Sequence, residues 1–180
     1  MEGRREWEIR GTAYSYLRRL ILCGTIRYVT SKTVRMSTLI SRYLVIQVAK
    51  LSGFSPIITT VSPRNSDLVK ALGATHTIDR NLSSDEIIAT VKSITADPVK
   101  IVYDAISLPS TQNPAYDIVS PGGKLILVLN VEIDKAKLTP DKEIINPYGN
   151  VHAEGNRAFG SEMYSHLTNL FKSGDLKVRT

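Results

Sequence analysis

Cysteine is almost absent from the sequence, with Cys23 as the one cysteine among 180 residues. A lone cysteine excludes a disulfide framework within the chain, and this usage is typical of an intracellular compartment. The three histidines, His76, His152 and His166, stand far apart, so no paired spacing predicts a closed tetrahedral zinc site. We therefore expect a cytoplasmic protein without a metal centre.

Long apolar runs are also lacking, since no stretch approaches the length of a transmembrane helix, and we expect no membrane partner. Residues 44–180 show no charge imbalance either, because they hold fourteen of the 23 basic and fourteen of the 17 acidic residues. The net charge of +6 therefore comes from residues 1–43, with nine Lys or Arg and three Glu. A balanced main part disfavours nucleic-acid binding. The basic head is a basic arm, a targeting segment or sequence foreign to the fold, and its early Glu2 and Glu6 disfavour targeting.

What the sequence does contain, from about Ser37 onward, is a regular alternation of predicted helices and strands. The β-branched run after Gly53 is too short for a helix and fits a strand buried on both faces, as in a parallel sheet. The predicted elements are a helix from Ser37 or Thr38 to Leu51, a strand over Ile57–Val61, a helix over Pro63–Leu72 with Ser62 as its N-cap, a strand over Thr75–Ile78, a helix from Ser83 or Ser84 to Ile94, a strand over Lys100–Asp104, a helix after Pro109 and a strand over Lys124–Leu129.

Beyond Leu129 the pattern weakens. Residues 131–149 are polar and contain two prolines, which predicts an irregular surface connection. A short last strand over Asn150–His152 and a closing helix over Asn156–Lys172 are expected to follow. The whole alternation predicts an α/β fold, a Rossmann-like, doubly wound parallel sheet. We expect one domain over residues 44–180 and an atypical segment over 1–43, whose best candidates for a first strand are Leu17–Cys23 and then Thr25–Thr30.

The residues after the Ile57–Val61 strand indicate which nicotinamide cofactor such a fold would take. An acidic residue there accepts hydrogen bonds from the ribose 2′-hydroxyl of NAD, whereas an Arg with small polar neighbours suits the 2′-phosphate of NADP. The chain has Ser62, Pro63, Arg64 and Asn65, with no acid before Asp67, which favours NADP. The alternative is that Ser62-Pro63 only starts a helix and Arg64 is a solvated surface charge.

Several stretches in the same order carry a family resemblance: VIQVAKLSGFSPIITTVSPRNSDLVKALGATHTIDR, then VKIVYDAIS, SPGGKLILVLN and NRAFGSEMYSHLTNLFKSGDLK. From Val45 to Lys177 the chain resembles the cofactor-binding half of the zinc-independent medium-chain dehydrogenase/reductases, in particular their quinone-oxidoreductase-like and fungal trans-acting enoyl reductase branch. The resemblance implies a Rossmann fold, NADPH as hydride donor, and reduction of an activated carbon–carbon double bond or a quinone in a small-molecule substrate.

The resemblance also implies cofactor-binding residues. Ser62 to Asn65 match the segment that receives the 2′-phosphate and adenine ribose, and Arg80 stands beside the adenine. Leu129 and Asn130 match the segment that lines the nicotinamide side. A further cofactor-lining strand end is matched by Val151, His152, Ala153, Glu154 and Gly155. Structural alternatives stay open: Leu129 as plain core, Asn130 as a turn former, Arg80 as a solvated charge, and the strand-end residue Asp104 as a turn or cap residue rather than a ligand-binding one.

Glycine is missing where this family needs it, because none occurs between Gly24 and Gly53. A glycine-rich turn normally lets backbone amides approach the pyrophosphate at a helix N-terminus. Here the turn positions run from Met36 to Arg42, with Arg42 in place of a glycine. Side chains there hold the backbone away from phosphates, with Arg35 and Arg42 compensating only in part. We therefore expect weakened or absent cofactor binding.

No catalytic residue is assigned, since the chain has neither a GxSxG nor an HExxH motif. Complete family members carry a substrate domain before this fold and a final segment after it, neither of which is matched. We expect a truncated or altered copy of such a reductase, inactive by itself, that forms a homodimer or associates with a catalytic partner. The alternative is a non-catalytic Rossmann remnant with weak or no nucleotide binding.

Overall fold

The computed structural model describes residues 39–147, 150 and 152–177, with side chains described from Tyr43 onward in the first helix. The described residues fall into two compact units, one formed by residues 39–147 and the other within residues 150–177. No described helix is long and apolar enough to cross a membrane.

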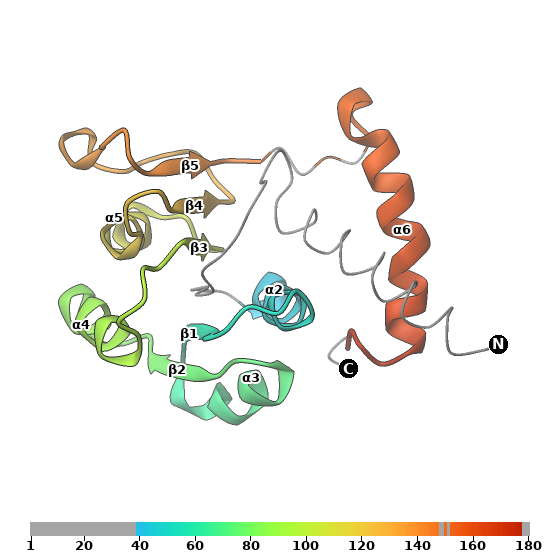
Figure 1. Ribbon diagram of the computed structural model, residues 1–180, viewed down its shortest axis with the longest axis horizontal. Helices are drawn as coiled ribbons and strands as arrows, with labels where there is room; N and C mark the ends of the chain where they lie inside the picture. Colours follow the sequence, from blue (N-terminus) through green and yellow to red (C-terminus); the bar gives the residue numbers. More distant parts are fainter. Residues whose placement is uncertain (1–38, 148–149, 151, 178–180) are drawn as a thin grey trace. The chain divides into compact units, whose positions relative to one another are not determined.

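Helices and strands alternate along residues 39–147, as the sequence predicts (Figure 1). Most lie within one or two residues of their predicted bounds. The elements are α2 (Leu39–Leu51), β1 (Ile58–Val61), α3 (Ser66–Leu72), β2 (His76–Asp79), α4 (Ser84–Ile94), β3 (Ile101–Asp104), α5 (Pro109–Ile118), β4 (Lys124–Leu127) and β5 (Glu143–Ile145).

All the strands pair in parallel, in two hydrogen-bonded groups, β1 with β2 and β3 with β4 and β5. Helices α3 and α5 provide the crossovers that parallel neighbours require, from β1 to β2 and from β3 to β4. Helices α4 and α5 contact each other on one side of the strands, and α2 and α3 contact each other on the opposite side (Figure 1). Helices on both faces of parallel strands confirm the predicted Rossmann-like α/β fold.

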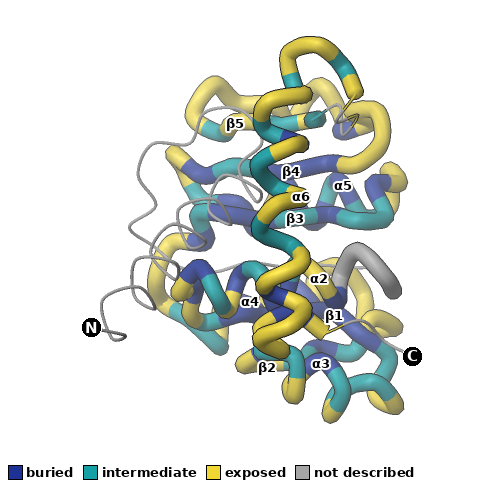
Figure 2. The backbone as a smooth tube through the Cα atoms, turned by 90° about the vertical axis from the view of Figure 1, so that its right-hand side faces the viewer, coloured by how far each residue is buried: buried dark blue, intermediate teal, exposed yellow. Residues whose placement is uncertain are grey.

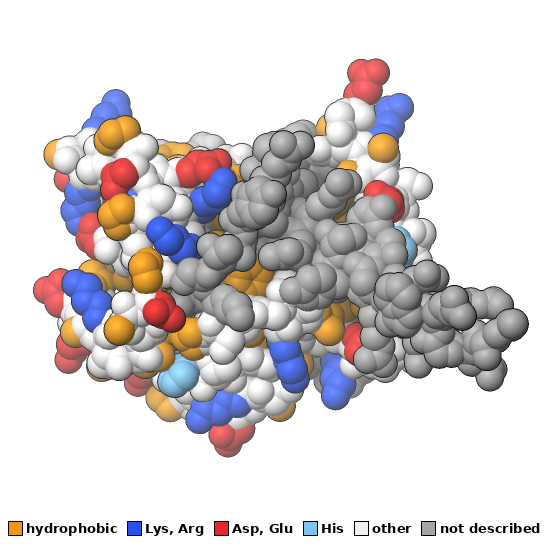
Figure 3. All heavy atoms as spheres, in the orientation of Figure 1, with side chains coloured by type: hydrophobic (Ala, Val, Ile, Leu, Met, Phe, Trp, Pro, Cys, Tyr) orange, Lys and Arg blue, Asp and Glu red, His pale blue; other side chains and the backbone are white. Residues whose placement is uncertain are grey.

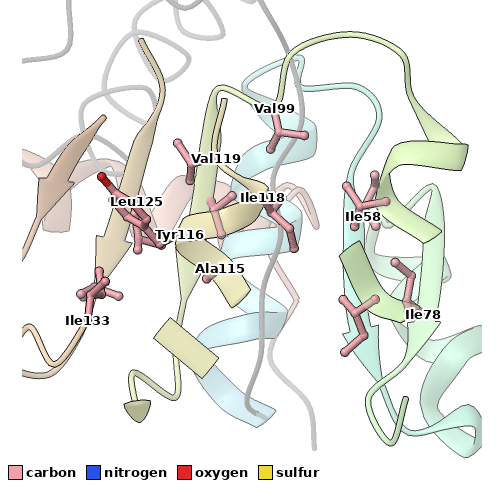
Figure 4. Close-up of a cluster of buried hydrophobic side chains, with 13 residues drawn as sticks. Ile58, Ile78, Val99, Ala115, Tyr116, Ile118, Val119, Leu125 and Ile133 are labelled. Atoms are coloured by element: carbon pink, nitrogen blue, oxygen red, sulfur yellow. The ribbon is translucent and has the colours of Figure 1, made fainter. Parts of the chain in front are cut away.

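One apolar core joins the two groups of strands. Ile58 of β1 and Ile78 of β2 belong to the same buried cluster as Leu125 of β4 and residues of α5 (Figure 4). All four residues of β1 are buried, which fits a strand covered on both faces. In Figure 2 the buried residues follow the strands, and exposed residues lie on outer helical turns and loops. The two groups are therefore parts of one packed fold.

Local signals fix several helix ends. Ser83 is the N-cap of α4: its Oγ accepts a hydrogen bond from Glu86 N (3.3 Å), and Glu86 Oε2 accepts one from Ser83 N (2.8 Å). This reciprocal capping box decides between Ser83 and Ser84 in favour of Ser83. Helix α3 ends at Gly73, whose φ of +126° suits glycine, and a Cβ there would meet the Lys50 side chain.

The helix predicted from Pro63 begins differently. Pro63–Asn65 form a 3-10 turn, in which Asn65 N donates to Ser62 O at 2.9 Å, and the α-helix starts only at Ser66. Ser62 holds the N-cap position, but its side chain makes no capping hydrogen bond. Ser62 is therefore the N-cap of the 3-10 turn, and the prediction that the α-helix begins at Pro63 is wrong over Pro63–Asn65.

The connection predicted as irregular over residues 131–149 contains a 3-10 turn (Lys135–Lys137) and the unpredicted strand β5. Buried Tyr116 anchors this connection, because its hydroxyl accepts a hydrogen bond from Thr139 N (2.8 Å) and its carbonyl accepts one from Lys142 Nζ (3.0 Å). An ion pair between Lys124 and Glu143 then links the first residues of β4 and β5. The irregular reading is wrong at β5, because tertiary contacts create the strand.

In the second unit, helix α6 spans Arg157–Lys172, close to its predicted bounds, after a 3-10 turn over Glu154–Asn156. Its predicted apolar face is partly or fully buried, at Phe159, Met163, Leu167 and Leu170. The predicted strand at Asn150–His152 is wrong at His152, which lies in a turn. Val151 and the candidate first strands Leu17–Cys23 and Thr25–Thr30 lie outside the described residues.

Candidate functional site

The carboxyl ends of β1 and β2 bring two predicted site segments together. Arg80, just after β2, donates its backbone N–H to the carbonyl of Val61, the last residue of β1, at 3.1 Å. Ser62 and the 3-10 turn follow Val61 directly. The predicted 2′-phosphate segment and the predicted adenine neighbour Arg80 therefore lie side by side at one edge of the paired strands, the edge where parallel α/β sheets bind ligands.

The polar side chains of this turn are not used by the turn itself. Ser62 is the N-cap of the 3-10 turn and Asn65 is the N-cap of α3, yet neither side chain makes a capping hydrogen bond. Arg64 between them is exposed, and within the described part of the chain neither Arg64 nor Arg80 forms an ion pair. A hydroxyl, an amide and two guanidinium groups thus remain available for a ligand.

The turn itself contains no carboxylate that could pair with these donors. Asp67 lies in the first turn of α3, where its charge complements the helix N-terminus. Asp79, at the end of β2, accepts a hydrogen bond on Oδ1 from Asn81 N at 3.0 Å. In the view of Figure 3, basic and acidic side chains are interspersed over the described surface. The turn after β1 therefore combines donors and positive charge locally, which is the set that an exposed phosphate group requires.

At the end of β3, buried Asp104 has a structural role. Its Oδ1 accepts a hydrogen bond from Ile106 N (3.0 Å), and its Oδ2 accepts one from the Thr111 hydroxyl (2.6 Å). These bonds confirm the interpretation of Asp104 as a turn residue. Burial, and then the neighbouring Asp104 carboxylate, raise the pKa of the Tyr103 hydroxyl above its ordinary 10.0.

Leu129 and Asn130 lie beyond the end of β4, because the strand stops at Leu127 rather than at Leu129 as predicted. Both side chains are exposed, with Leu129 at 52%. The interpretation of Leu129 as plain core is therefore wrong. Sequence reasoning missed two residues that hold this segment, Gln112 and Ser107, which are both buried.

The last predicted segment belongs to the second unit. His152 N donates to Asn150 Oδ1 at 2.9 Å, and the carbonyl of His152 accepts a hydrogen bond from Arg157 Nε at 3.0 Å. Ala153 is half-buried, whereas Glu154 and Gly155 are exposed in the 3-10 turn before α6. A cofactor-lining role for Val151 to Gly155 stays a prediction.

Among the described residues, no three His, Cys, Asp or Glu side chains are grouped so that they could hold a metal ion.

Of the predicted glycine-free turn, Met36 to Thr38 lie outside the described residues, and Leu39 to Arg42 are helical in backbone.

Comparison with known proteins finds a matching family model and several similar proteins. A family model described as zinc-binding dehydrogenase matches residues 43–173. Among curated proteins, the trans-enoyl reductase mpsG of Macrophomina phaseolina is 29% identical over 148 residues, covering 73% of this chain and 40% of the relative. The trans-enoyl reductase FSL5 of Gibberella zeae is 44% identical over 84 residues, covering 45% of this chain and 22% of the relative. The chain thus spans less than half the length of these relatives.

Solved structures show the same fold. A quinone oxidoreductase from Pseudomonas syringae superposes with a TM-score of 0.70 at 24% identity, covering 95% of this chain and 53% of that one. A mycobacterial protein solved in complex with NADPH gives a TM-score of 0.74 at 21% identity, covering 92% of this chain and 53% of that one. At these identities the superpositions establish the fold.

Proposed function

The chain belongs to the zinc-binding dehydrogenase family, a family of oxidoreductases, and from this premise we propose that it binds NADPH as the cofactor-binding part of a reductase. The proposed substrate is a small molecule with an activated carbon–carbon double bond or a quinone. The names of relatives support this substrate class, since trans-enoyl reductases and a quinone oxidoreductase are among them.

One observation carries the choice of NADPH over NADH. The N-cap residues Ser62 and Asn65 flank exposed Arg64 at the carboxyl end of β1, and neither uses its side chain to cap a helix. A 2′-phosphate at this place would accept charge-assisted hydrogen bonds from the Arg64 guanidinium and further hydrogen bonds from the hydroxyl and the amide. A bare ribose would leave the Arg64 charge without a partner.

The hydride in such a reaction comes from the nicotinamide of the cofactor, so the tasks of this chain are to bind, to orient and to exclude water. Ser62, Pro63, Arg64 and Asn65 would hold the 2′-phosphate and ribose, and Arg80 would lie beside the adenine. Leu129 and Asn130 would line the nicotinamide side. The proton that completes the reduction would come from solvent, and no side chain of the described site is assigned to deliver it.

A second candidate function is favoured by the lack of glycine between Gly24 and Gly53. Without a close amide cradle for the pyrophosphate, affinity would rest on the 2′-phosphate segment and be low. If the affinity is too low to measure, the chain is a non-catalytic Rossmann remnant. A titration of the chain with NADPH and NADH separates the two functions.

The test is a calorimetric titration of the chain with NADPH and with NADH. We expect NADPH to bind more tightly than NADH. We also expect Arg64→Ala to weaken NADPH about tenfold and to leave NADH nearly unchanged, because one charge-assisted contact to an exposed phosphate is lost.

Lys70→Ala is the matched control, since it removes one positive charge from an exposed residue of the neighbouring helix α3. It should leave both affinities unchanged. Equal weakening by the two variants would assign the effect to overall charge, and no binding of either nucleotide to the folded wild-type chain would favour the remnant.

Association in the cytoplasm with a second copy, or with a partner that supplies the catalytic remainder, also stays a prediction. Exposed apolar side chains such as Leu108 and Leu138 give it a physical basis. Sedimentation velocity of the chain alone would show a single monomeric species if self-association is absent.

A further inference from the structure

The segment that follows β4, residues 128–132, has its backbone held by side chains from neighbouring elements. Val128 N donates to Ser107 Oγ at 2.9 Å. Gln112 Nε2 donates to the carbonyl of Asn130 at 2.8 Å, and Gln112 Oε1 accepts from Glu132 N at 2.8 Å. Backbone groups that β4 no longer pairs are thus bound by Ser107, from the loop between β3 and α5, and by Gln112, from α5 itself. A third side chain, Asn146 after β5, donates to the carbonyl of Leu129 at 2.5 Å.

Gln112 is fully engaged. It is 0% exposed, and its Nε2 also donates to the carbonyl of Ser107 at 2.8 Å. Burying an amide side chain is unfavourable unless its donors and acceptor are satisfied. Here both hydrogens and the oxygen have partners, and two of the three partners lie in residues 128–132. The buried amide therefore joins the loop after β3 to the segment after β4.

Ser107 makes the second connection from a backbone conformation that serine seldom adopts. Its φ is +55°, it is 1% exposed, and its Oγ donates to the carbonyl of Asp104 at 2.7 Å while accepting from Val128 N. A left-handed backbone at a non-glycine residue is unfavourable and persists where surrounding contacts require it. The two hydrogen bonds of the Ser107 hydroxyl are contacts of this kind.

With its backbone bound inward, the 128–132 segment directs side chains outward. Val128, Leu129 and Val131 are 41%, 52% and 46% exposed, and Asn130 is exposed beside them. Apolar groups and one amide on a fixed backbone, at the carboxyl end of a parallel strand, form a surface suited to a flat heteroaromatic ring that carries a carboxamide.

We propose that Gln112 and Ser107 are positioning residues, which preorganise residues 128–132 to receive the nicotinamide half of NADPH. This inference rests on the proposed function and adds to it the residues that act through the segment. If the segment were not held, each binding event would have to order it, and the loss of conformational entropy would lower the affinity for the complete cofactor. Affinity for the adenosine half would stay unchanged, because that half would bind at the ends of β1 and β2.

The test compares two ligands, NADPH and adenosine 2′,5′-bisphosphate, which carries the 2′-phosphate but no nicotinamide. Gln112→Met keeps a long unbranched side chain and removes all three hydrogen bonds. We expect this variant to bind NADPH about tenfold more weakly and the bisphosphate with unchanged affinity. Unchanged affinity for NADPH, or equal weakening for both ligands, would overturn the inference.

Ser107→Gly provides an independent variant, since glycine tolerates a φ of +55° while both hydroxyl bonds are lost. It should show the same selective loss. Asn113→Ala is the matched control: Asn113 is the next residue of α5, and its Oδ1 accepts from Asp134 N (3.1 Å), beyond residues 128–132. It should change neither affinity.

The outcomes for the wild-type chain separate this inference from its premise. Binding of the bisphosphate with no tighter binding of NADPH would leave the 2′-phosphate site in place and overturn the positioning role. Binding of neither ligand would contradict the proposed function and the inference together. Loss of the folded circular dichroism spectrum in both Gln112→Met and Ser107→Gly would assign Gln112 and Ser107 a purely structural role. This result would also overturn the inference.

Discussion

At the scale of single residues, what separates a structural polar side chain from a candidate ligand-binding one is whether the fold already uses it. Asp104 and Ser62 both follow or end a buried strand, and the sequence predicts a cap or turn role for each as an alternative. Asp104 is buried and bonded to the turn after β3. Ser62 makes no capping bond. The sequence could not distinguish them, because the difference depends on the local turn geometry.

Gly123 is a residue at which the backbone leaves no room for a side chain. An added Cβ would stand 2.8 Å from the carbonyl oxygen of Ser120 and 3.0 Å from that of Val99, and 2.7 Å from a Val119 methyl carbon. Because two of these atoms are backbone, they cannot rotate away. We expect Gly123→Ala to lower the free energy of unfolding by about 1–3 kcal/mol, measured by urea denaturation.

Gly155→Ala is the control for this substitution, because a Cβ at Gly155 would meet no atom within 4 Å. It should change stability by less than about 0.5 kcal/mol. Equal stability of the Gly123 variant and the wild-type chain would show that the turn before β4 can open without cost.

At the scale of elements, the start of α4 depends on Ser83, whose side chain and backbone both bond to Glu86. We expect Ser83→Ala to lower the free energy of unfolding by about 1 kcal/mol, since one helix N–H loses its acceptor. Ser84→Ala, at the first helical position, should have little effect. Urea denaturation of the two variants measures the difference, and equal losses would contradict the assignment of the cap.

The same capping box has a pH dependence. Hydrogen bonds from the Ser83 hydroxyl and then from its backbone hold the pKa of Glu86 below its ordinary 4.5. A carboxylate whose folded-state pKa is lowered contributes stability above its unfolded pKa and loses it as pH falls through the folded value. A nuclear magnetic resonance titration should therefore place the Glu86 midpoint below 4.5 in the wild-type chain and return it toward 4.5 in Ser83→Ala. An unshifted wild-type midpoint would argue against the bond in solution.

Most elements of residues 39–147 follow from local signals, because apolar periodicity, caps and glycine stops act within a few residues. Strand β5 does not, since only three residues form it and their pairing depends on Tyr116 and Lys142. Gln112 was missed because a polar residue in a helix suggests an exposed face. The signal was present, however: Gln112 stands three and seven residues before buried Ala115 and Val119, on the apolar face of the sequence pattern.

At the scale of the whole molecule, family and fold rest on different observations. The family model covers residues 43–173, and the parallel strands with helices on both faces agree with solved structures at low identity. The candidate site is local by comparison. Its proposed 2′-phosphate half is predicted from Ser62 to Asn65 in the sequence, whereas the support of its proposed nicotinamide half depends on contacts between residues about twenty positions apart, such as Ser107 with Val128.

The most direct test of the central claim, that the carboxyl ends of β1 and β2 receive a 2′-phosphate, is a nuclear magnetic resonance titration of the labelled chain with NADPH and NADH. We expect NADPH to shift the backbone amide signals of Ser62, Arg64, Asn65 and Arg80, because the phosphate binds beside them, and NADH to shift them far less. Identical shifts with both nucleotides, or NADPH-induced shifts confined to other parts of the fold, would contradict the claim.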